Sequence, residues 1–201
     1  CPSQFVLDSI PVEIRQKTPC QISPFGSPPC EPVDFKRSQK SEILKLLFVG
    51  SMSQRKGLAD LFEAMKLLKG EPVSLSILGQ PSMPIDFYRK QFADFEFYPP
   101  CTNSKVREIM HQHDALILPS IVEGRALVQQ EALSRGLPII VTPNAGGEDL
   151  VEEGVTGKLV PIRSPEKIAE AISSMMANRK NRYEIQKLCQ KKAREYTWAK
   201  Y

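Results

Sequence analysis

The sequence contains no apolar run that approaches 18 residues, so it predicts no transmembrane helix. Its opening, CPSQFVLDSIPVE, lacks the basic stretch followed by an apolar stretch that marks a secretory signal. Histidine is scarce. The two that occur, His111 and His113, point to different faces of a helix at this spacing, so we expect no metal site. The net charge of +4 is too small to predict a nucleic-acid partner.

Cysteine shows no pairing pattern. The five residues are odd in number, scattered along the chain, and contain no Cys-x-x-Cys pair. Free thiols are typical of a reducing compartment, so we predict a cytoplasmic protein. The residues concerned are Cys1, Cys20, Cys30, Cys101 and Cys189.

Residues 1–44 differ from the rest in holding seven of the 17 prolines. Proline removes backbone donors and interrupts helices and strands, so we expect mostly irregular chain here. A short strand is expected around Gln21 to Ser23. An irregular N-terminal segment of this length is uncommon within a compact domain. We therefore interpret it as the end of a structural unit outside that domain.

From Ile43 onward, short apolar runs alternate with segments of helical periodicity. This alternation predicts a doubly wound α/β domain with a parallel sheet. The expected strands are residues 44–50, 73–79, 95–98, 114–120, 138–142 and 157–162. The expected helices are residues 57–70, 104–113, 125–136, 164–176 and 181–196, with N-caps at Ser104 and Ser164 and Pro165 at the first helical position.

A first candidate site is VGSMSQRKG, residues 49–57. A strand ends in glycine, and Arg55 and Lys56 precede Gly57 where a helix begins. Cations at a helix N-terminus are slightly unfavourable without an anion. Together with the free N–H groups of the helix, they favour a diphosphate site, and solvated cations are the alternative.

A second candidate site is the stretch PSIVEGRALVQQEALSRGLPIIVT, residues 119–142. Glu123 lies in a loop after a strand, and Glu131 lies one turn into the following helix. Ligands of parallel sheets bind at the carboxyl ends of the strands. Each carboxylate can accept hydrogen bonds from a sugar diol, whereas a solvated or capping role is the alternative for each residue. The loop from Asn144 to Gly147 contains a Gly-Gly pair and can approach a ligand closely, and a plain flexible turn is the alternative.

These motifs, in order over residues 45–198, resemble the C-terminal domain of the retaining glycosyltransferases of family four, which have the two-domain GT-B fold. The matching segments are VG....RKG, LSILG, DALILPS, EG..L...EAL..GLPIIVT, GG.DLV..G.TGKLVP and SPEKIAEAI. Two glutamates with seven residues between them are the family's characteristic motif. ISPFG in the first segment resembles the crossing between the two domains. The resemblance therefore implies that residues 1–44 are a remnant of the N-terminal domain and linker, and that residues 45–201 bind a nucleotide sugar.

The resemblance also implies roles for single residues. Glu131 would hold the ribose hydroxyls, Glu123 would contact the transferred sugar, and Lys56 would neutralise the leaving phosphate without a metal. Backbone N–H groups from Arg125 to Leu127 would contact the sugar and the diphosphate, and the nucleobase would lie near Gly79 and the Phe97–Pro99 edge. The implied donor site comprises Gly50, Ser51, Arg55, Lys56, Gly79, Tyr98, Glu123, Gly124, Arg125, Ala126, Leu127 and Glu131, with Glu123 and Lys56 catalytic.

Three positions depart from the family pattern. Ser51 stands where relatives often have arginine. Either Arg55 takes over the role of that arginine, or diphosphate binding is weaker. Arg125-Ala126 replaces the common Phe-Gly, so Arg125 is expected in or beside the donor pocket, with an effect on sugar choice. Tyr98 begins a Tyr-Pro-Pro run in place of a glycine, so the identity of the nucleobase is not predicted.

The implied function of the full-length protein is transfer of a sugar, with retention, from a nucleotide-diphosphate sugar to a glycan or lipid-linked acceptor, as in cell-surface polysaccharide synthesis. No cofactor or metal is implied, and the present chain is expected to be inactive alone. The alternatives are a sugar-nucleotide epimerase of the same fold and a non-catalytic nucleotide-binding module. The basic last helix is interpreted as a solvated face. Contact with anionic lipid at the inner face of the plasma membrane is the alternative.

Overall fold

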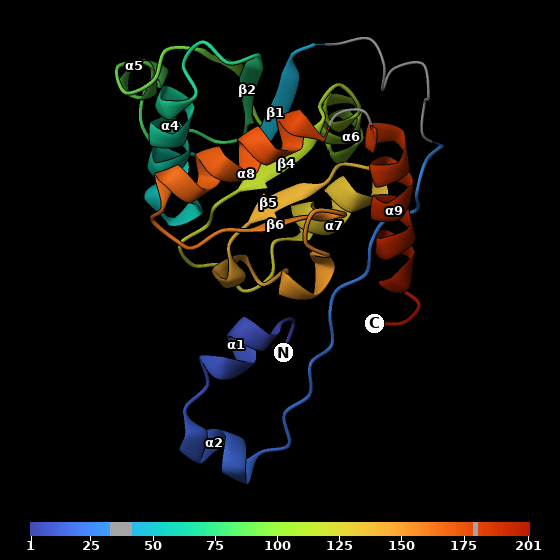
Figure 1. The fold of residues 1–201 in the computed structure, drawn as a ribbon. Helices are drawn as coiled ribbons and strands as arrows, with labels where there is room; N and C mark the ends of the chain where they lie inside the picture. The colour runs from blue at the N-terminus through green and yellow to red at the C-terminus, as the bar shows by residue number, and fades with distance from the viewer. Residues whose placement is uncertain (33–41, 179–180) are drawn as a thin grey trace.

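The computed structural model describes residues 1–32, 42–178 and 181–201, and its centre is a six-stranded sheet (Figure 1). All strand pairs are parallel, and the order across the sheet is β3-β2-β1-β4-β5-β6. The predicted doubly wound sheet is therefore confirmed. The strands are β1 (Leu44–Val49), β2 (Val73–Leu78), β3 (Phe95–Tyr98), β4 (Ala115–Leu118), β5 (Ile139–Val141) and β6 (Gly157–Leu159).

The strand order reverses between β1 and β4, which are neighbours in the sheet although far apart in sequence. Leu46 of β1 is in register with Ala115 of β4. The chain builds outward from β1 in one direction and from β4 in the other. In open α/β sheets such a reversal opens a crevice at the carboxyl ends of the strands, which is where ligands bind.

Helices cover both faces of the sheet. Helices α4 and α8 pack against each other on one face, and α7 packs against α9 on the other (Figure 1). The helices of this domain are α4 (Leu58–Leu67), α5 (Ile85–Arg89), α6 (Asn103–His111), α7 (Leu127–Ser134), α8 (Pro165–Ala177) and α9 (Arg182–Glu195). Pro165 begins α8 as predicted.

The core lies between the sheet and these helices. Three consecutive residues of β1, Leu46 to Phe48, are fully buried, as is every residue of β4. Successive strand side chains point to opposite faces, so such runs occur only where both faces are covered. Burial of each large side chain contributes about 1.5–3 kcal/mol. The short apolar runs of the sequence are thus explained by burial on both faces.

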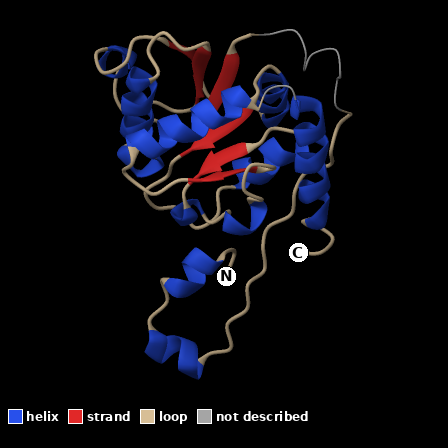
Figure 2. Ribbon diagram, in the orientation of Figure 1, coloured by secondary structure: helices blue, strands red, loops and turns tan. Residues whose placement is uncertain are grey.

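The first segment differs from the prediction. Residues Gln4–Asp8 and Val12–Lys17 form short helices, α1 and α2, which stand below the main body (Figure 2). The Ser3 hydroxyl caps α1 by accepting from the Val6 N–H. The described chain forms no strand at Gln21 to Ser23, so that prediction is wrong. The segment is extended there, and its one isolated β-bridge joins Ser27 to Thr197.

Two further differences from the sequence analysis concern helices. The N-cap of α6 is Thr102, whose side chain accepts from the Lys105 N–H, so the predicted cap at Ser104 is wrong. The short helix α5 was not predicted, because Pro84 and a single turn leave no helical period to detect.

The extended part of the first segment binds the domain through its far end. The Phe25 ring stacks on Trp198, and the Ser27 N–H donates to the Tyr196 carbonyl at 2.6 Å. Glu31 forms ion pairs with Arg135 and His111. Residues 25–31 are thereby fixed to the α7 and α9 side of the domain.

Candidate functional site

Two glycines shape the carboxyl ends of β1 and β2. The Gly50 N–H donates to the Leu78 carbonyl at 2.9 Å, and the Gly79 N–H donates to the Tyr98 carbonyl at 3.1 Å. Gly79 has a φ of +155°, and a Cβ there would lie 1.8 Å from the Gly50 carbonyl oxygen. Only glycine permits this approach. The three strand ends β1, β2 and β3 are therefore brought to one edge, as predicted.

The predicted cations lie in a 3-10 turn, Gln54–Lys56, directly before α4. Gly57 follows with a φ of +71°, and a Cβ on it would lie 1.9 Å from the Pro119 carbonyl oxygen. The turn is therefore pressed against the chain that leaves β4. The Ile121 N–H donates to the Arg55 carbonyl at 2.8 Å, which joins the two loops.

Both cations converge on Glu123. The Arg55 guanidinium lies 2.7 Å from Oε2 of Glu123, and the Lys56 ammonium contacts the same oxygen. The Lys56 side chain is 11% exposed, whereas Arg55 is half exposed. A lysine this buried needs a partner, and the carboxylate provides one. Two positive charges on one negative charge leave the cluster net positive at a helix N-terminus, which favours an anionic ligand.

A second loop, Pro143–Leu150, packs along the Glu123 loop. The Glu123 N–H donates to the Asn144 carbonyl at 2.9 Å, and the Ala126 N–H donates to the Ala145 carbonyl at 3.3 Å. The Ala126 N–H was expected to face the ligand, but the protein itself already uses it. The Asn144 to Gly147 loop, predicted to lie close to the site, does lie beside Glu123.

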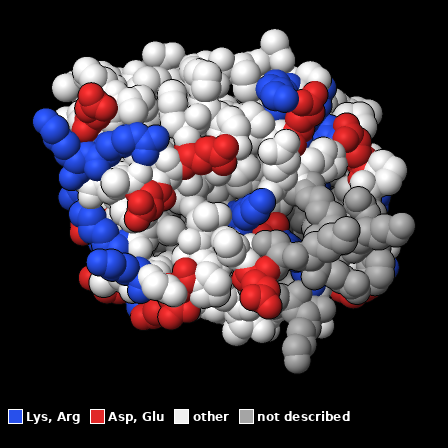
Figure 3. Space-filling model, turned by 90° about the horizontal axis from the view of Figure 1, so that it is seen from above, with Lys and Arg blue, Asp and Glu red and all other residues white. Residues whose placement is uncertain are grey.

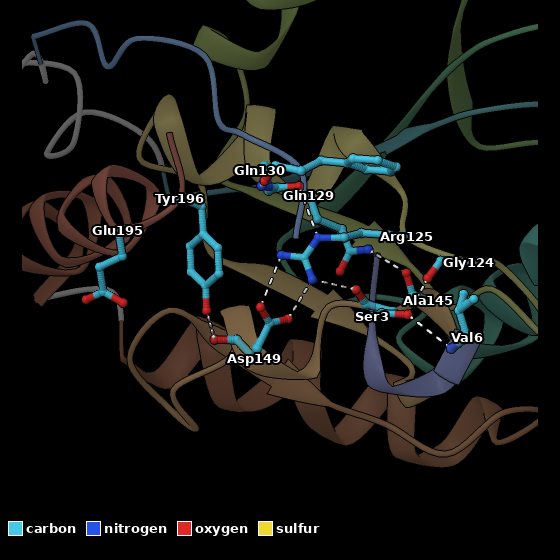
Figure 4. Close-up of polar contacts among 12 residues, drawn as sticks. Ser3, Val6, Gly124, Arg125, Gln129, Gln130, Ala145, Asp149, Glu195 and Tyr196 are labelled. Carbon is cyan, nitrogen blue, oxygen red and sulfur yellow. Dashed lines mark hydrogen bonds and ion pairs between the residues drawn. The ribbon is translucent and has the colours of Figure 1, made fainter. Parts of the chain in front are cut away.

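Arg125 does not extend into open space. Its side chain is fully buried, and its guanidinium donates to both carboxylate oxygens of Asp149, at 2.8 and 3.1 Å (Figure 4). It also donates to the Gly146 carbonyl at 3.2 Å. The structure therefore places this guanidinium in the packing between the two loops, not free to approach a sugar.

Glu131 lies on α7, half buried, beside Arg107 of α6. Burial raises the pKa of the Glu131 carboxyl, and the Arg107 charge opposes that rise. Within the described part of the chain, this carboxylate has no hydrogen-bond or ion-pair partner. It is thus a desolvated acceptor that is available to a ligand. The structure does not place it in contact with Lys56 or Glu123, which lie in the adjoining loops.

The remaining predicted residues line the edge without strong contacts. The Ser51 hydroxyl lies 3.1 Å from that of Ser53, and Leu127 is exposed at the start of α7. Burial and a hydrogen bond with Glu96 raise the pKa of Tyr98 to about 12, so this hydroxyl stays a donor at neutral pH. Gly124 accepts a 2.6 Å hydrogen bond from the Ser3 hydroxyl at its carbonyl.

Sequence reasoning missed three residues at this site. Asp149 stands in the DLV segment but was assigned no role, Arg107 belongs to no motif, and only the fold brings the two to Arg125 and Glu131. Gln129 is fully buried, and its amide donates to the Ala145 carbonyl at 2.8 Å. Its signal was a polar residue at a position of α7 that faces the protein, which the helical period alone could have marked.

The basic last helix is largely paired. Lys187 contacts Glu184, Lys192 contacts Glu152 and Glu195, and Arg182 contacts Asp114. Arg179 and Lys180, which belonged to the predicted basic face, lie outside the described residues. On the face seen from above, basic and acidic side chains are interspersed (Figure 3). No helix in the described ranges has the length and apolar content needed to cross a membrane.

The parallel sheet, its strand reversal and the flanking helices define a Rossmann-like α/β domain of the GT-B glycosyltransferase kind. The chain belongs to the family described as glycosyl transferases group 1, whose model matches residues 31–196. It is 29% identical over 165 residues to a D-inositol 3-phosphate glycosyltransferase of Corynebacterium glutamicum, covering 76% of this chain and 40% of the relative. It is 26% identical over 144 residues to an uncharacterized 41.2 kDa protein in the cps region of Klebsiella pneumoniae, covering 70% and 40%.

Solved structures share the fold. A glycosyltransferase from Rickettsia africae matches with a TM-score of 0.81 at 16% identity, over 99% of this chain and 59% of that chain. Anabaena Alr3699/HepE in complex with UDP matches with a TM-score of 0.72 at 17% identity, over 83% and 50%. The chain thus spans about half the length of the proteins it resembles.

Proposed function

We propose that the carboxyl edge of this sheet binds a nucleoside-diphosphate sugar and that the full-length protein transfers the sugar to an acceptor. The observation that carries this proposal is the convergence of Arg55 and Lys56 on Glu123 in front of a helix N-terminus. The family membership supports a transferase, and the structural likeness to a protein in complex with UDP supports this ligand class.

In this proposal, the two cations bind the diphosphate. When the bond between the anomeric carbon and the phosphate breaks, negative charge builds on the departing diphosphate, and Lys56 stabilises it. Lys56 is well placed for this because its side chain is buried, where charge interactions are stronger than in water. No metal is needed for that step. Glu123 holds the cations in position and contacts hydroxyl groups of the sugar.

Glu131 binds the ribose in the same proposal. Its carboxylate is desolvated and has no partner among the described residues, so a ribose diol would satisfy it. Transfer with retention, a glycan or lipid-linked acceptor, and a cytoplasmic location at the membrane face complete the proposal. The family resemblance, and not the geometry of this chain, supports these last points.

The test is calorimetric titration of the chain with UDP, GDP and ADP, with each matching nucleoside, and with UDP-glucose. We expect at least one diphosphate to bind more tightly than its nucleoside. Equal binding of nucleoside and diphosphate would remove the role of the cations, and no binding of any diphosphate would overturn the proposal. Turnover of a nucleotide sugar to free diphosphate and an epimerised sugar, without an acceptor, would favour the epimerase alternative.

A further inference from the structure

Arg125 and Asp149 form an unusual ion pair between the two loops of the site. The arginine side chain is fully buried, while the aspartate side chain is about a third exposed. Both carboxylate oxygens are engaged, which is the bidentate geometry that fixes position as well as charge. Removing such a pair from water costs free energy. One role that can account for a buried ion pair is to fix a single arrangement of the chain around it.

The contacts of Arg125 extend beyond this pair. Its guanidinium donates to the Gly146 carbonyl at 3.2 Å and to Oε1 of Gln130 at 3.3 Å. Gly146 has a φ of +68°, and a Cβ on it would lie 2.0 Å from the Gly124 carbonyl oxygen. One side chain thus holds the second loop at its closest approach to the first, at the residue that directly follows Glu123.

Helix α9 covers this pair from outside. The Tyr196 hydroxyl donates to the Asp149 carbonyl at 3.2 Å, and the Arg125 guanidinium lies 5.5 Å from the Tyr196 ring centroid. Burial, reinforced by the Asp149 charge, raises the pKa of Tyr196, so this hydroxyl stays protonated and able to donate. The far face of Arg125 is therefore occupied by protein.

We propose that Arg125 is a positioning residue: its bidentate pair with Asp149 locks the Pro143–Leu150 loop onto the Glu123 loop and so sets the position of Glu123 and its two cations. This inference rests on the proposed function only where it is tested by nucleotide binding. It differs from the expectation, drawn from the sequence, that Arg125 lies in or beside the donor pocket and affects sugar choice. Arg125 acts through Asp149 and Gly146, and neither the diphosphate nor the sugar touches its guanidinium.

The chain offers a matched control at the opposite edge of the sheet. Arg182 pairs with Asp114 beside a hollow lined by Leu44, Pro138 and Gly157, at the amino ends of the strands. Its side chain is 13% exposed, so Arg182→Met, like Arg125→Met, removes a largely buried arginine from an ion pair with an aspartate. Arg182→Met should therefore lower stability as Arg125→Met does, without any effect on the carboxyl edge.

The experiment compares Arg125→Met, Arg125→Lys and Arg182→Met at a temperature where circular dichroism shows each to be folded. UDP and uridine binding are measured by calorimetry. We expect Arg125→Met to weaken UDP about tenfold or more and to leave uridine within about twofold, with Arg125→Lys intermediate because it keeps the charge without the fork. Arg182→Met should leave both affinities unchanged. Equal loss in Arg125→Met and Arg182→Met, or no loss in either, would overturn the proposal.

A second readout separates this inference from the proposed function. Hydrogen exchange of residues 143–150 should become faster in Arg125→Met and stay unchanged in Arg182→Met, whether or not UDP binds. If the parent chain binds no diphosphate but the loop still loosens, the proposed function fails and the positioning role stands. If exchange in the loop is unchanged by Arg125→Met, the positioning role is wrong.

Discussion

At the scale of the residue, Lys56 is the side chain on which the proposed chemistry most depends. Lys56→Met keeps the length of the side chain and removes its charge. We expect the affinity for UDP to fall by about 1.5–3 kcal/mol, the range for hydrogen bonds to charged groups, while uridine binding stays nearly constant. Calorimetric titration with both ligands measures the difference.

A control for this variant is Lys158→Met. Lys158 pairs with Glu153 and lines the hollow at the opposite edge of the sheet, and its side chain is a quarter exposed. It should leave UDP binding unchanged. A similar loss for uridine and UDP in Lys56→Met would show that the lysine supports the fold of the edge and not the diphosphate.

We predict that Glu131 lowers the stability of the folded protein at neutral pH and contributes to nucleotide binding. The pKa of Glu131 is raised in the folded state, so the folded protein binds this proton more tightly than the unfolded chain does. The stability that this adds is fully present below the ordinary glutamate pKa of about 4.3 and is lost as the pH rises through the pKa of the folded state. At pH 7 the charged carboxylate therefore costs stability. Glu131→Gln should raise the melting temperature at pH 7, and the gain should shrink as pH falls toward 4.

The same variant should weaken UDP by about 1–3 kcal/mol, because a neutral amide is a poorer acceptor for the ribose diol. Glu71→Gln, at an exposed position after α4, is the control and should change neither quantity. A lower melting temperature at pH 7 together with unchanged UDP binding would assign Glu131 a purely structural role.

At the scale of the element, the contact between the two loops depends on Gly146. A Cβ there would lie 2.0 Å from the Gly124 carbonyl oxygen, which is backbone and cannot move aside cheaply. Gly146→Ala should lower the melting temperature and weaken UDP together, because it separates the Pro143–Leu150 loop from the Glu123 loop. Thermal denaturation and calorimetry measure the two effects.

Gly154→Ala isolates the part of this effect that is due to contact. Gly154 has a φ of +74°, close to the +68° of Gly146, but no atom lies within 4 Å of its added Cβ. Both variants bear the left-handed penalty of about 1–2 kcal/mol, and only Gly146→Ala adds a clash. Equal destabilisation by the two would contradict the importance of the loop contact.

The elements show what sequence could and could not predict. Every strand was predicted: the central strands β1 and β4 are short apolar runs buried on both faces, and the edge strands β3 and β6 follow from the alternation of strands and helices. The cations and Glu123 were predicted as separate motifs, and the fold brings them together. Asp149 was not predicted as the partner of Arg125, because the two are joined by the strand order and by no local pattern. The burial of Arg125 was not predicted for the same reason: packing from elements distant in sequence decides it.

The N-terminal segment shows the same limit. Its prolines correctly indicated an absence of long elements, but they gave no sign of α1, which the Ser3 hydroxyl caps. A helix of one turn has no period to read, and its stability comes from tertiary contact. The Ser3 hydroxyl also donates to the Gly124 carbonyl, so this segment contributes to the candidate site.

At the scale of the whole molecule, we predict binding without transfer. The chain spans about half the length of its relatives, and the donor contacts proposed here all lie within it. A nucleotide sugar would be held with one side open to water, where charge interactions are screened. The proposal assigns the acceptor site to the part of the relatives that this chain does not match, so we expect the chain alone to lack the orientation of the acceptor that accounts for much of the rate of such reactions.

An assay with a glycan acceptor and a radiolabelled sugar of whichever nucleotide binds in the titration tests this, using the chain and a full-length parent protein in parallel. We expect that nucleotide sugar to bind to the chain while labelled product forms only with the parent. Transfer by the chain at a rate near that of the parent would refute the assignment of acceptor binding to another domain.

The docking of residues 25–31 beside α9 has a consequence for synthesis on the ribosome. The partners of Phe25 and Ser27 are Trp198 and Tyr196, so this segment cannot complete its docking until those two residues have emerged. At about 5–20 residues per second, that interval is on the order of ten to thirty seconds. During it, the sheet can assemble from β1 onward while residues 25–31 remain accessible to chaperones and proteases. Closure of this segment onto the nascent domain is therefore a late step, which waits for α9 to be made.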